Sequence, residues 1–583
     1  MNAKCYKKGY PRPKLVRERY ELLDGEWDFT FDESKGERFS QLKQGKGFDR
    51  KIIVPYSYQT KKSGIGVDDD YPVVWYARTF RSAHGKGERC ILHFEGVDHE
   101  ATVFLNGERI AVHEGGYARF SCDVTPYLRG GDNLLVVRAE DRLDPACPRG
   151  KQRHKPVNTA CFYTATTGIW RSVWLEYVPD VYIKSTYNEI VYGECKLNVH
   201  FCVNEWEEGL EFRVTAEYQG RLVARVTTAL TAQEGEVALN LENRDQQLPM
   251  KPWSIGRTDQ IYDLKYELLR NGETVDTALS YTGLVDYRAD ENRILVNYLP
   301  ANYFRMVLDQ GYYGDGGMTA TDDELLRDVR LIKQMGFTGV RMHQKIEDER
   351  FYYFCDMEGL FVWCEMPSVY VTTDASKRAL LSEWQEILLQ YRGYLSIMAW
   401  VPFNESWGCL QVYENRSQQD FVNAAYFLTK DFCDGRFVVG NDGWEHTYTD
   451  LLTLHNYCQD GKSLAEAYRD VAAFAGGKRV SDRYTRSAFC KGYEYGGQPV
   501  LVSEYGGIKF SEEGGWGYGK EVRSKEEFYE RLKELTAAIT CNPAISGYCL
   551  TQFTDVMQEQ NGLLREDRTP KIDLEKIAEI NRL

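Results

Sequence analysis

The pattern of apolar and polar positions changes twice along the chain, and the first part has a period of two. Between about residues 17 and 179, short segments alternate apolar and polar side chains, as at 25–31, 91–96, 101–107, 134–139 and 169–176. This alternation indicates strands with one buried face, and Asn106-Gly107 is a typical hairpin turn. Many short strands with glycine-rich turns predict a β jelly roll, which we assign to residues 1–179.

A second β region follows at 180–286. Its alternating segments at 197–203, 211–218 and 262–269 are again of strand length. About seven short strands in a region of this size are typical of an immunoglobulin-like β-sandwich.

From residue 287 onward, strand-like and helix-like segments alternate. Thr321-Asp-Asp-Glu324 is a candidate capping box at the start of the first helix. The predicted strands are 304–310, 337–343, 360–367, 396–405, 436–444, 451–457, 499–505 and 545–555, and the predicted helices are 321–335, 348–359, 380–393, 418–434, 464–475, 525–539 and 574–581. Eight repeated βα units predict a C-terminal (β/α)8 TIM barrel over 287–583, with a doubly wound sheet as the alternative.

Composition narrows the classes of partner. The 583 residues, with a net charge of −15, suit a multidomain protein and argue against a nucleic-acid partner. No apolar run reaches the ~18 residues of a membrane span, and residues 1–16 lack an apolar signal core. The 15 cysteines include no CxxC pair, so we expect reduced thiols in a cytoplasmic protein, with no metal site and no cofactor.

Two glutamates carry the candidate chemistry. Glu405 ends the apolar segment Trp400-Val-Pro-Phe-Asn-Glu405, and Glu504 ends Pro499-Val-Leu-Val-Ser-Glu504. They close the fourth and seventh predicted barrel strands, and barrel active sites lie at the C-terminal ends of the strands. Two carboxylates on one rim are what a retaining glycosidase needs, one as nucleophile and one as acid/base.

These motifs resemble those of glycoside hydrolase family 2, which includes β-galactosidases, β-glucuronidases and β-mannosidases. Asn404-Glu405 is similar to the acid/base motif of the family, and Ser503-Glu-Tyr-Gly506 to its nucleophile motif. The resemblance extends over nearly the whole chain, through Leu23-Asp-Gly-Glu-Trp-Asp-Phe29, Gly168-Ile-Trp170, Lys251-Pro-Trp-Ser254, Asn561-Gly562 and Asp567-Arg-Thr-Pro-Lys571.

The resemblance implies a retaining exo-β-glycosidase that acts by double displacement. Glu504 would attack the anomeric carbon, and Glu405 would protonate the leaving oxygen and then activate water. Arg341 would hold the nucleophile ionised, Tyr457 would orient it, and Asn404 would bind the 2-hydroxyl group of the sugar.

Three further candidates for substrate binding also have a purely structural interpretation. Trp444 ends the fifth predicted strand, where it could stack on the sugar or pack within the rim. His343 and Lys345 follow Arg341, and could contact the substrate or lie in a solvated loop.

The sugar itself is less certain. β-Glucuronidases carry an Asn-x-Lys motif that binds the substrate carboxylate, whereas this chain has Glu559-Gln-Asn561 in that place. A β-galactosidase is therefore our leading prediction, and a β-hexuronidase (glucuronidase or galacturonidase) or β-mannosidase the alternative. Arg305, Lys345 or Arg565 could bind the carboxylate of a uronide in place of the missing lysine, so a uronide substrate stays open.

Other functions and partners also stay open. A catalytically silent carbohydrate-binding protein is the alternative outside enzymes, and the two candidate catalytic glutamates argue against it. The expected partner is a carbohydrate β-glycoside, with no nucleic acid and no membrane. The resemblance also leaves a homo-oligomer and a loosely bound cation open.

Overall fold

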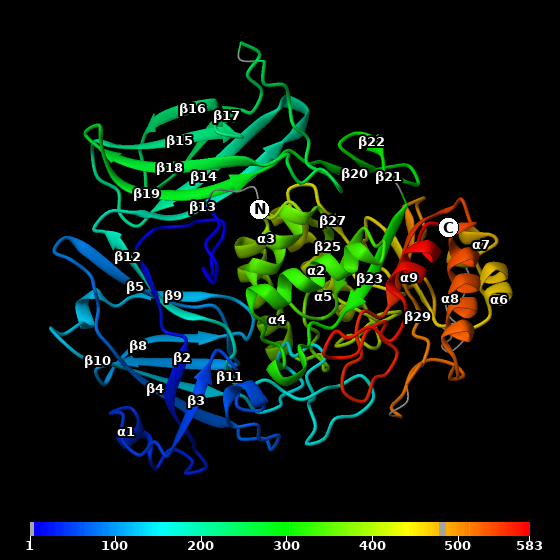
Figure 1. Ribbon diagram of the computed structural model, residues 1–583, viewed down its shortest axis with the longest axis horizontal. Coiled ribbons are helices and arrows are strands. Elements are labelled where there is room, and N and C mark those ends of the chain that lie inside the picture. Colours follow the sequence, from blue (N-terminus) through cyan, green and yellow to red (C-terminus); the bar gives the residue numbers. More distant parts are fainter. Residues whose placement is uncertain (1–4, 246, 302, 477–485, 512–513) are drawn as a thin grey trace.

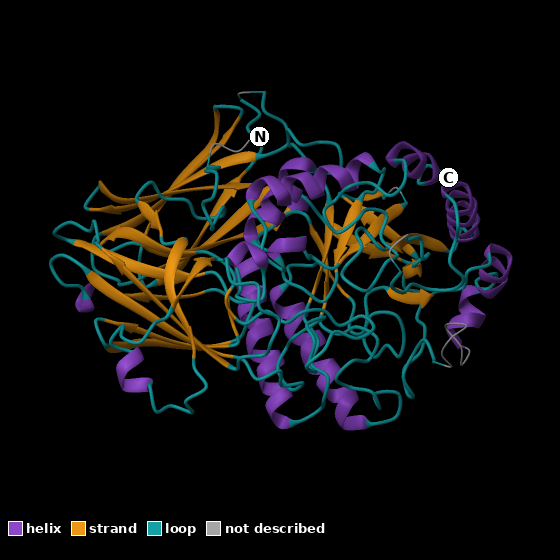
Figure 2. Cartoon of the chain, turned by 60° about the horizontal axis from the view of Figure 1, so that its bottom comes forward, coloured by secondary structure: helices purple, strands orange, loops and turns teal. Residues whose placement is uncertain are grey.

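The computed structural model describes residues 5–245, 247–301, 303–476, 486–511 and 514–583. Its jelly roll and immunoglobulin-like sandwich lie beside each other on one flank of a C-terminal barrel (Figure 1). The two β domains consist almost wholly of strands and loops, whereas helices surround the barrel strands (Figure 2). This arrangement confirms the predicted fold class.

The jelly roll contains two main antiparallel sheets. They have the strand orders β1-β12-β5-β9 and β3-β2-β4-β10-β7-β8, and β11 pairs with β6. Apolar side chains of both sheets meet in one core, which contains Trp27, Phe29, Leu92 and Val137. The strands are β1 (Tyr20–Leu22), β2 (Gly25–Phe31), β3 (Arg50–Val54), β4 (Val73–Phe80), β5 (Glu88–Phe94), β6 (Val97–Asp98), β7 (Glu100–Leu105), β8 (Glu108–Glu114), β9 (Phe120–Asp123), β10 (Asn133–Glu140), β11 (Gly168–Ile169) and β12 (Val173–Pro179).

Local chemistry explains two details of this domain. Asn106 and Gly107 both have positive φ, at 54° and 88°, which the predicted hairpin turn between β7 and β8 requires. The single strand predicted at 169–176 is wrong, because β11 and β12 belong to different sheets. Between them, the buried Arg171 donates to the backbone oxygens of Tyr117 and Ile346.

The second domain is a sandwich of seven strands. Its sheets have the orders β13-β14-β17 and β16-β15-β18-β19, with a core that includes Val199, Phe212 and Tyr266. The strands are β13 (Ile183–Val191), β14 (Lys196–Val203), β15 (Leu210–Tyr218), β16 (Arg221–Ala229), β17 (Glu234–Asn240), β18 (Tyr262–Arg270) and β19 (Glu273–Thr282). A small sheet of β20 (Tyr287–Asp290), β21 (Arg293–Val296) and β22 (Leu299–Pro300) precedes the barrel. The domain limits predicted at 179 and 286 stay predictions.

The barrel sheet is parallel, in the order β27-β26-β25-β24-β23-β30-β29-β28. This is the circular strand order of a (β/α)8 barrel, written from the fifth strand round to the sixth. Where these two strands meet, the Gly443 N–H donates to Thr453 Oγ1 at 3.1 Å. The strands are β23 (Phe304–Asp309), β24 (Gly339–Met342), β25 (Phe361–Glu365), β26 (Ile397–Val401), β27 (Phe437–Val438), β28 (Leu452–Asn456), β29 (Val500–Gly506) and β30 (Ile545–Thr551).

The helices of the barrel follow the predicted order with shifted ends. The predicted capping box at Thr321 and Glu324 is present at the start of the first helix. The helix predicted at 464–475 is in fact two helices. The barrel helices are α2 (Asp322–Gln334), α3 (Glu349–Glu358), α4 (Asp374–Tyr391), α5 (Arg416–Phe432), α6 (Gly461–Ala467), α7 (Val471–Gly476), α8 (Lys525–Thr540) and α9 (Leu574–Ile580), and α1 (Phe39–Leu42) lies in the jelly roll. No helix among the described residues is long and apolar enough to cross a membrane.

A buried arginine joins the two β domains. Arg17 donates to Glu176 Oε1 on β12 at 2.7 Å and to Asp276 Oδ2 on β19 at 2.8 Å. It also donates to the backbone oxygen of Ile183 at 2.6 Å. Because all three charged side chains are almost fully buried, each depends on the others for charge compensation.

We therefore expect Arg17→Ala to destabilise the protein. The substitution leaves Glu176 and Asp276 buried without their cation, which costs about 3–5 kcal/mol. Lys8→Ala is the control, since Lys8 and Asp323 form an exposed ion pair at 2.8 Å and such pairs contribute about 0–1 kcal/mol. Thermal unfolding should show a clear loss of Tm for Arg17→Ala only; equal melting temperatures for the two variants would contradict this role.

Candidate active site

The C-terminal ends of the barrel strands place their polar side chains around one buried arginine. Arg341 on β24 is fully buried and donates from Nη1 to Glu504 Oε1 at 2.7 Å. It also donates from Nε to Glu365 Oε2 at 3.0 Å and from Nη2 to Asn404 Oδ1 at 2.7 Å. Nη2 lies 2.8 Å from Asp442 Oδ2 as well. One guanidinium on β24 thus connects four side chains, which belong to or follow β25, β26, β27 and β29.

Glu504 is held at both carboxylate oxygens. Arg341 binds Oε1, and the Tyr457 hydroxyl donates to Oε2 at 2.5 Å. Burial opposes ionisation of this side chain, but the charges of His455 and Arg341 lower the pKa of Glu504 to about 2. The arrangement keeps Glu504 as a carboxylate near neutral pH, as a nucleophile requires.

Glu405 lies on a tight turn, four residues after β26. Glu405 and Ser406 have φ values of 51° and 60°, and the Trp407 N–H donates to the Asn404 oxygen at 2.9 Å. Positive φ at two central residues is typical of a type I′ turn and unusual for side chains of this size. The prediction that Glu405 ends a regular strand is therefore wrong in detail, while Glu504 lies within β29.

His455 on β28 lies between the two glutamates. Its Nδ1 is 2.8 Å from Glu405 Oε1 and 3.5 Å from Glu504 Oε2, and its Nε2 is 3.4 Å from Asp442 Oδ2. One oxygen of each glutamate and one ring nitrogen of His455 all lie within 4.8 Å of one another. The structure therefore brings the two predicted catalytic carboxylates to a single site.

Near neutral pH, His455 carries a positive charge, whereas Glu365 is mainly protonated and neutral. Burial would lower the pKa of His455, but Glu504 and Asp442 raise it to about 10, so the ring is a cation near neutral pH. Burial raises the pKa of Glu365 to about 8, against the charge of Arg341. Glu405, His455 and Glu504 could hold a metal ion only if His455 lost its proton on binding.

Tyr457 contacts Glu504 directly, Asn404 is connected to Glu504 through Arg341, and the roles predicted for both stay predictions. Asn404 accepts from Arg341 through Oδ1, while its buried Nδ2 has no hydrogen-bond partner among the described residues. Such a donor is available to a substrate hydroxyl. The Tyr457 ring stacks on Tyr518, with centroids 3.4 Å apart, and this contact fixes its orientation.

The positions of two other candidates differ from the expectation. The fifth strand ends at Val438, so Trp444 follows it by six residues and packs edge-on against His455 at 5.6 Å. His343 is buried, and its Nδ1 lies 3.2 Å from Glu365 Oε2. Burial and the charge of Arg341 hold the pKa of His343 well below its usual range, so it is neutral.

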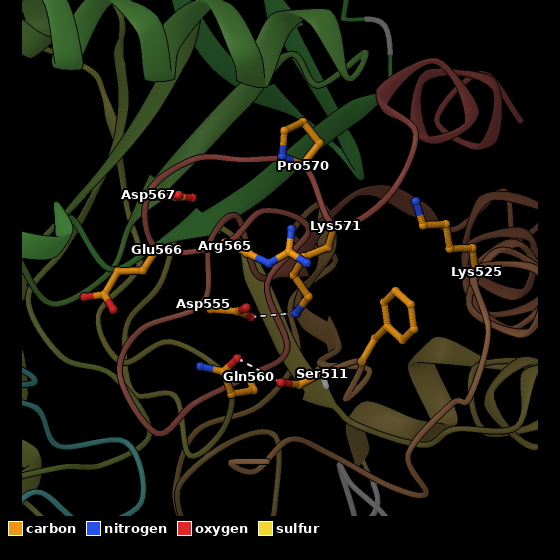
Figure 3. A pocket seen from close by; sticks show the side chains of 10 residues that line it. Ser511, Lys525, Asp555, Gln560, Arg565, Glu566, Asp567, Pro570 and Lys571 are labelled. Atoms are coloured by element: carbon orange, nitrogen blue, oxygen red, sulfur yellow. Dashed lines mark hydrogen bonds and ion pairs between the residues drawn. The ribbon is translucent and has the colours of Figure 1, made fainter. Parts of the chain in front are cut away.

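Lys345, Arg305 and Arg565 do not lie ready to bind a sugar carboxylate. Lys345 Nζ is buried and donates to Gly311 O, Met318 O and Glu347 Oε2 at 2.6–2.9 Å. Arg305 lies near the start of β23, at the opposite end of the barrel. Arg565 lines a separate cavity of about 420 Å³ with Asp555, Gln560 and Lys571 (Figure 3).

A loop of the jelly roll reaches over the barrel rim. The N–H groups of Arg149 and Gly150 donate to Ser368 O at 3.0 and 3.2 Å, and Tyr163 donates to Glu559 Oε2 at 2.6 Å. Gly150 has φ of 58°, and a Cβ there would lie 2.1 Å from the Gln344 oxygen, so only glycine fits. In Figure 1 this cyan loop extends to the red segment after β30.

This loop brings a cation, Lys151, close to the glutamates. Lys151 is 9% exposed. Burial alone would lower its pKa, but Cys161, Glu405 and Glu504 raise it to about 12. The first domain therefore adds a charged group to a site that the barrel otherwise builds.

Sequence reasoning missed His455, Glu365, Asp442 and Lys151. His455 precedes Tyr457 by two residues, so a strand places both on the same face, and this spacing could have identified it. Glu365 ends an apolar strand just as Glu504 does. No local signal points to Lys151, because a different domain supplies it.

Comparisons with known proteins find one matching domain and several similar chains. Residues 67–173 match the family described as glycosyl hydrolase 2 galactose-binding domain-like. A β-galactosidase of Thermoanaerobacter pseudethanolicus is 27% identical over 403 residues, which are 66% of this chain and 50% of that protein. A β-glucuronidase of Bacteroides fragilis is 24% identical over 425 residues, or 66% of this chain and 56% of its own. The match thus spans about half the length of these curated relatives.

Solved structures share the whole fold. A Bifidobacterium dentium β-glucuronidase complexed with coumarin-3-O-glucuronide has a TM-score of 0.78 at 21% identity, with 97% of each chain covered. A β-galacturonidase from Eisenbergiella tayi has a TM-score of 0.76 at 18% identity, with 98% of each chain covered. The chain thus shares the fold of these two enzymes, and its residues 67–173 match a domain of glycosyl hydrolase family 2.

Proposed function

We propose that this protein is a retaining exo-β-glycosidase that hydrolyses terminal β-linked sugars. The observation that carries the proposal is the approach of a Glu405 and a Glu504 oxygen to within 4.8 Å of each other. Retaining enzymes hold their two carboxyl groups about 5–5.5 Å apart, whereas inverting enzymes need about 6.5–9.5 Å to fit a water molecule.

The reaction has two displacement steps. In the first, Glu504 attacks the anomeric carbon and Glu405 gives its proton to the glycosidic oxygen, so that the C–O bond breaks and a glycosyl ester forms. In the second, Glu405 takes a proton from water, whose oxygen displaces Glu504 from the same carbon. The unpaired Nδ2 of Asn404 is placed to bind the 2-hydroxyl group.

His455 supports both steps as a positioning residue. Its Nδ1 lies 2.8 Å from Glu405 Oε1, so the protonated ring can donate a hydrogen bond to the carboxylate that Glu405 becomes after the first step. Its positive charge also favours the carboxylate form of Glu504.

The glycone that we favour is a neutral sugar, galactose first. Glu559 is buried beside the jelly-roll loop, where it accepts from Tyr163 and Asn561. A fixed carboxylate at this position suits sugar hydroxyls and repels an acidic sugar. Lys151 favours the second candidate, a β-hexuronide, because its ammonium could pair with a sugar carboxylate.

The absence of disulfide-bonded cysteines among the described residues supports the cytoplasmic location that we also propose.

Substitution of the two glutamates tests the mechanism. We expect Glu504→Gln to abolish turnover, because no other carboxylate is placed to form the ester. Glu405→Gln should slow hydrolysis by about 10²–10⁴-fold. Azide should then restore turnover of nitrophenyl glycosides, since azide attacks without a general base, and NMR should show a β-glycosyl azide. The exposed Glu414→Gln is the matched control; an α product would contradict retention.

Removal of the His455 cation should change the pH dependence. The charge of His455 helps lower the pKa of Glu504 to about 2, so its loss in His455→Gln raises that pKa. Glu504 then becomes protonated at a higher pH as the solution is acidified. The acid limb of the kcat/KM profile should therefore move to higher pH than in the wild type. An unchanged acid limb would rule out this electrostatic role.

A panel of nitrophenyl β-glycosides identifies which sugar the protein hydrolyses. We expect the highest kcat/KM for the galactoside, with Lys151→Met changing it only slightly. The second candidate would be established by two results together: a preference for the glucuronide or galacturonide, and a fall of about 10–100-fold in kcat/KM for that sugar in Lys151→Met. A fall of this size corresponds to the loss of one charge-assisted hydrogen bond. Hydrolysis of none of the panel by folded protein would refute the glycosidase proposal and favour a carbohydrate-binding protein.

A further inference from the structure

A second cavity, of about 260 Å³, lies where the jelly-roll loop meets the barrel rim. The loop contributes His154, Val157 and Phe162, and the barrel contributes Tyr370, Trp407 and Leu410. None of the steps above uses these six side chains.

Aromatic rings form the walls of this cavity. Tyr370 stacks on His154 at 5.0 Å between centroids, with 23° between the planes. Tyr370 also meets Phe162 at 5.1 Å and Trp407 at 5.6 Å, both edge to face. Rings held by one another in this way form a rigid apolar surface that suits a flat ligand.

The cavity adjoins the acid/base glutamate. Trp407 is the last residue of the tight turn that carries Glu405, and the hydrogen bond from its N–H to the Asn404 oxygen closes that turn. Ser406, between them, donates to Glu445 Oε2 at 2.7 Å and accepts from Asn441, which fixes the turn. One fixed turn thus carries both Glu405 and Trp407, a residue that lines the cavity.

Two features of the cavity remain unexplained by the packing of the protein alone. The indole Nε1 of Trp407 is buried without a hydrogen-bond partner in the part of the chain that the structure describes. Val157 and Leu410 at the rim are 62% and 53% exposed. An unused donor and exposed apolar side chains around an aromatic cavity indicate a ligand with a flat apolar body and an acceptor atom.

We propose that this cavity is the aglycone subsite and that it binds a planar aromatic leaving group. The proposal rests on the proposed glycosidase function and names the chemical class of the group that is released.

Competitive inhibition by two thioglycosides tests the subsite. Phenyl and methyl 1-thio-β-glycosides of the sugar selected by the panel share one glycone and differ only in the aglycone. In the wild type, we expect the phenyl compound to bind about tenfold more tightly, which corresponds to one buried ring with favourable stacking. Trp407→Ala and Leu410→Asp should bring the two Ki values to within about twofold.

Leu389→Asp is the matched control, because Leu389 is 48% exposed on α4, away from the cavity. It should keep the wild-type ratio. Leu410 is exposed, so Leu410→Asp should fold even if Trp407→Ala does not. Hydrolysis with an unchanged Ki ratio in Leu410→Asp would overturn the subsite and leave the glycosidase function intact. A protein that hydrolyses no glycoside would overturn both.

Discussion

A buried arginine at the end of β24 is the constraint on which the catalytic centre depends. Arg341 is fully buried, and a cation in that position is tolerated only when carboxylates and hydrogen-bond acceptors surround it. Asp442 and Glu504 supply negative charge, and Glu365 and Asn404 supply further acceptor oxygens. Because these side chains come from different strands, the requirement to compensate one cation fixes the distances between groups that the reaction needs.

The barrel alone does not complete the site. The jelly-roll loop approaches so closely that a Cβ on Gly150 would collide with the Gln344 oxygen. Tyr163 then binds Glu559, and the charges of Glu405 and Glu504 act on Lys151. The buried Arg17 joins the two β domains to each other.

Different interactions dominate on the proposed glycone and aglycone sides of the candidate site. On the glycone side, a dense network of charges and hydrogen bonds sets the ionisation of Glu504 and the charge of His455. On the proposed aglycone side, Phe162, Tyr370 and Trp407 offer rigid ring faces. The turn that carries Glu405 joins the two sides.

The sequence by itself determined the three β and βα regions, because hydrophobic periodicity is a local property that secondary structure must satisfy. It also identified Glu405 and Glu504, since a glutamate that ends an apolar strand is conspicuous. It overextended the fifth strand to Trp444, because apolar character does not show where a ladder ends. Only the tertiary structure placed His455 between the glutamates and Lys151 beside them. Distances between side chains from different strands and domains are set by packing and charge compensation, which no local pattern records.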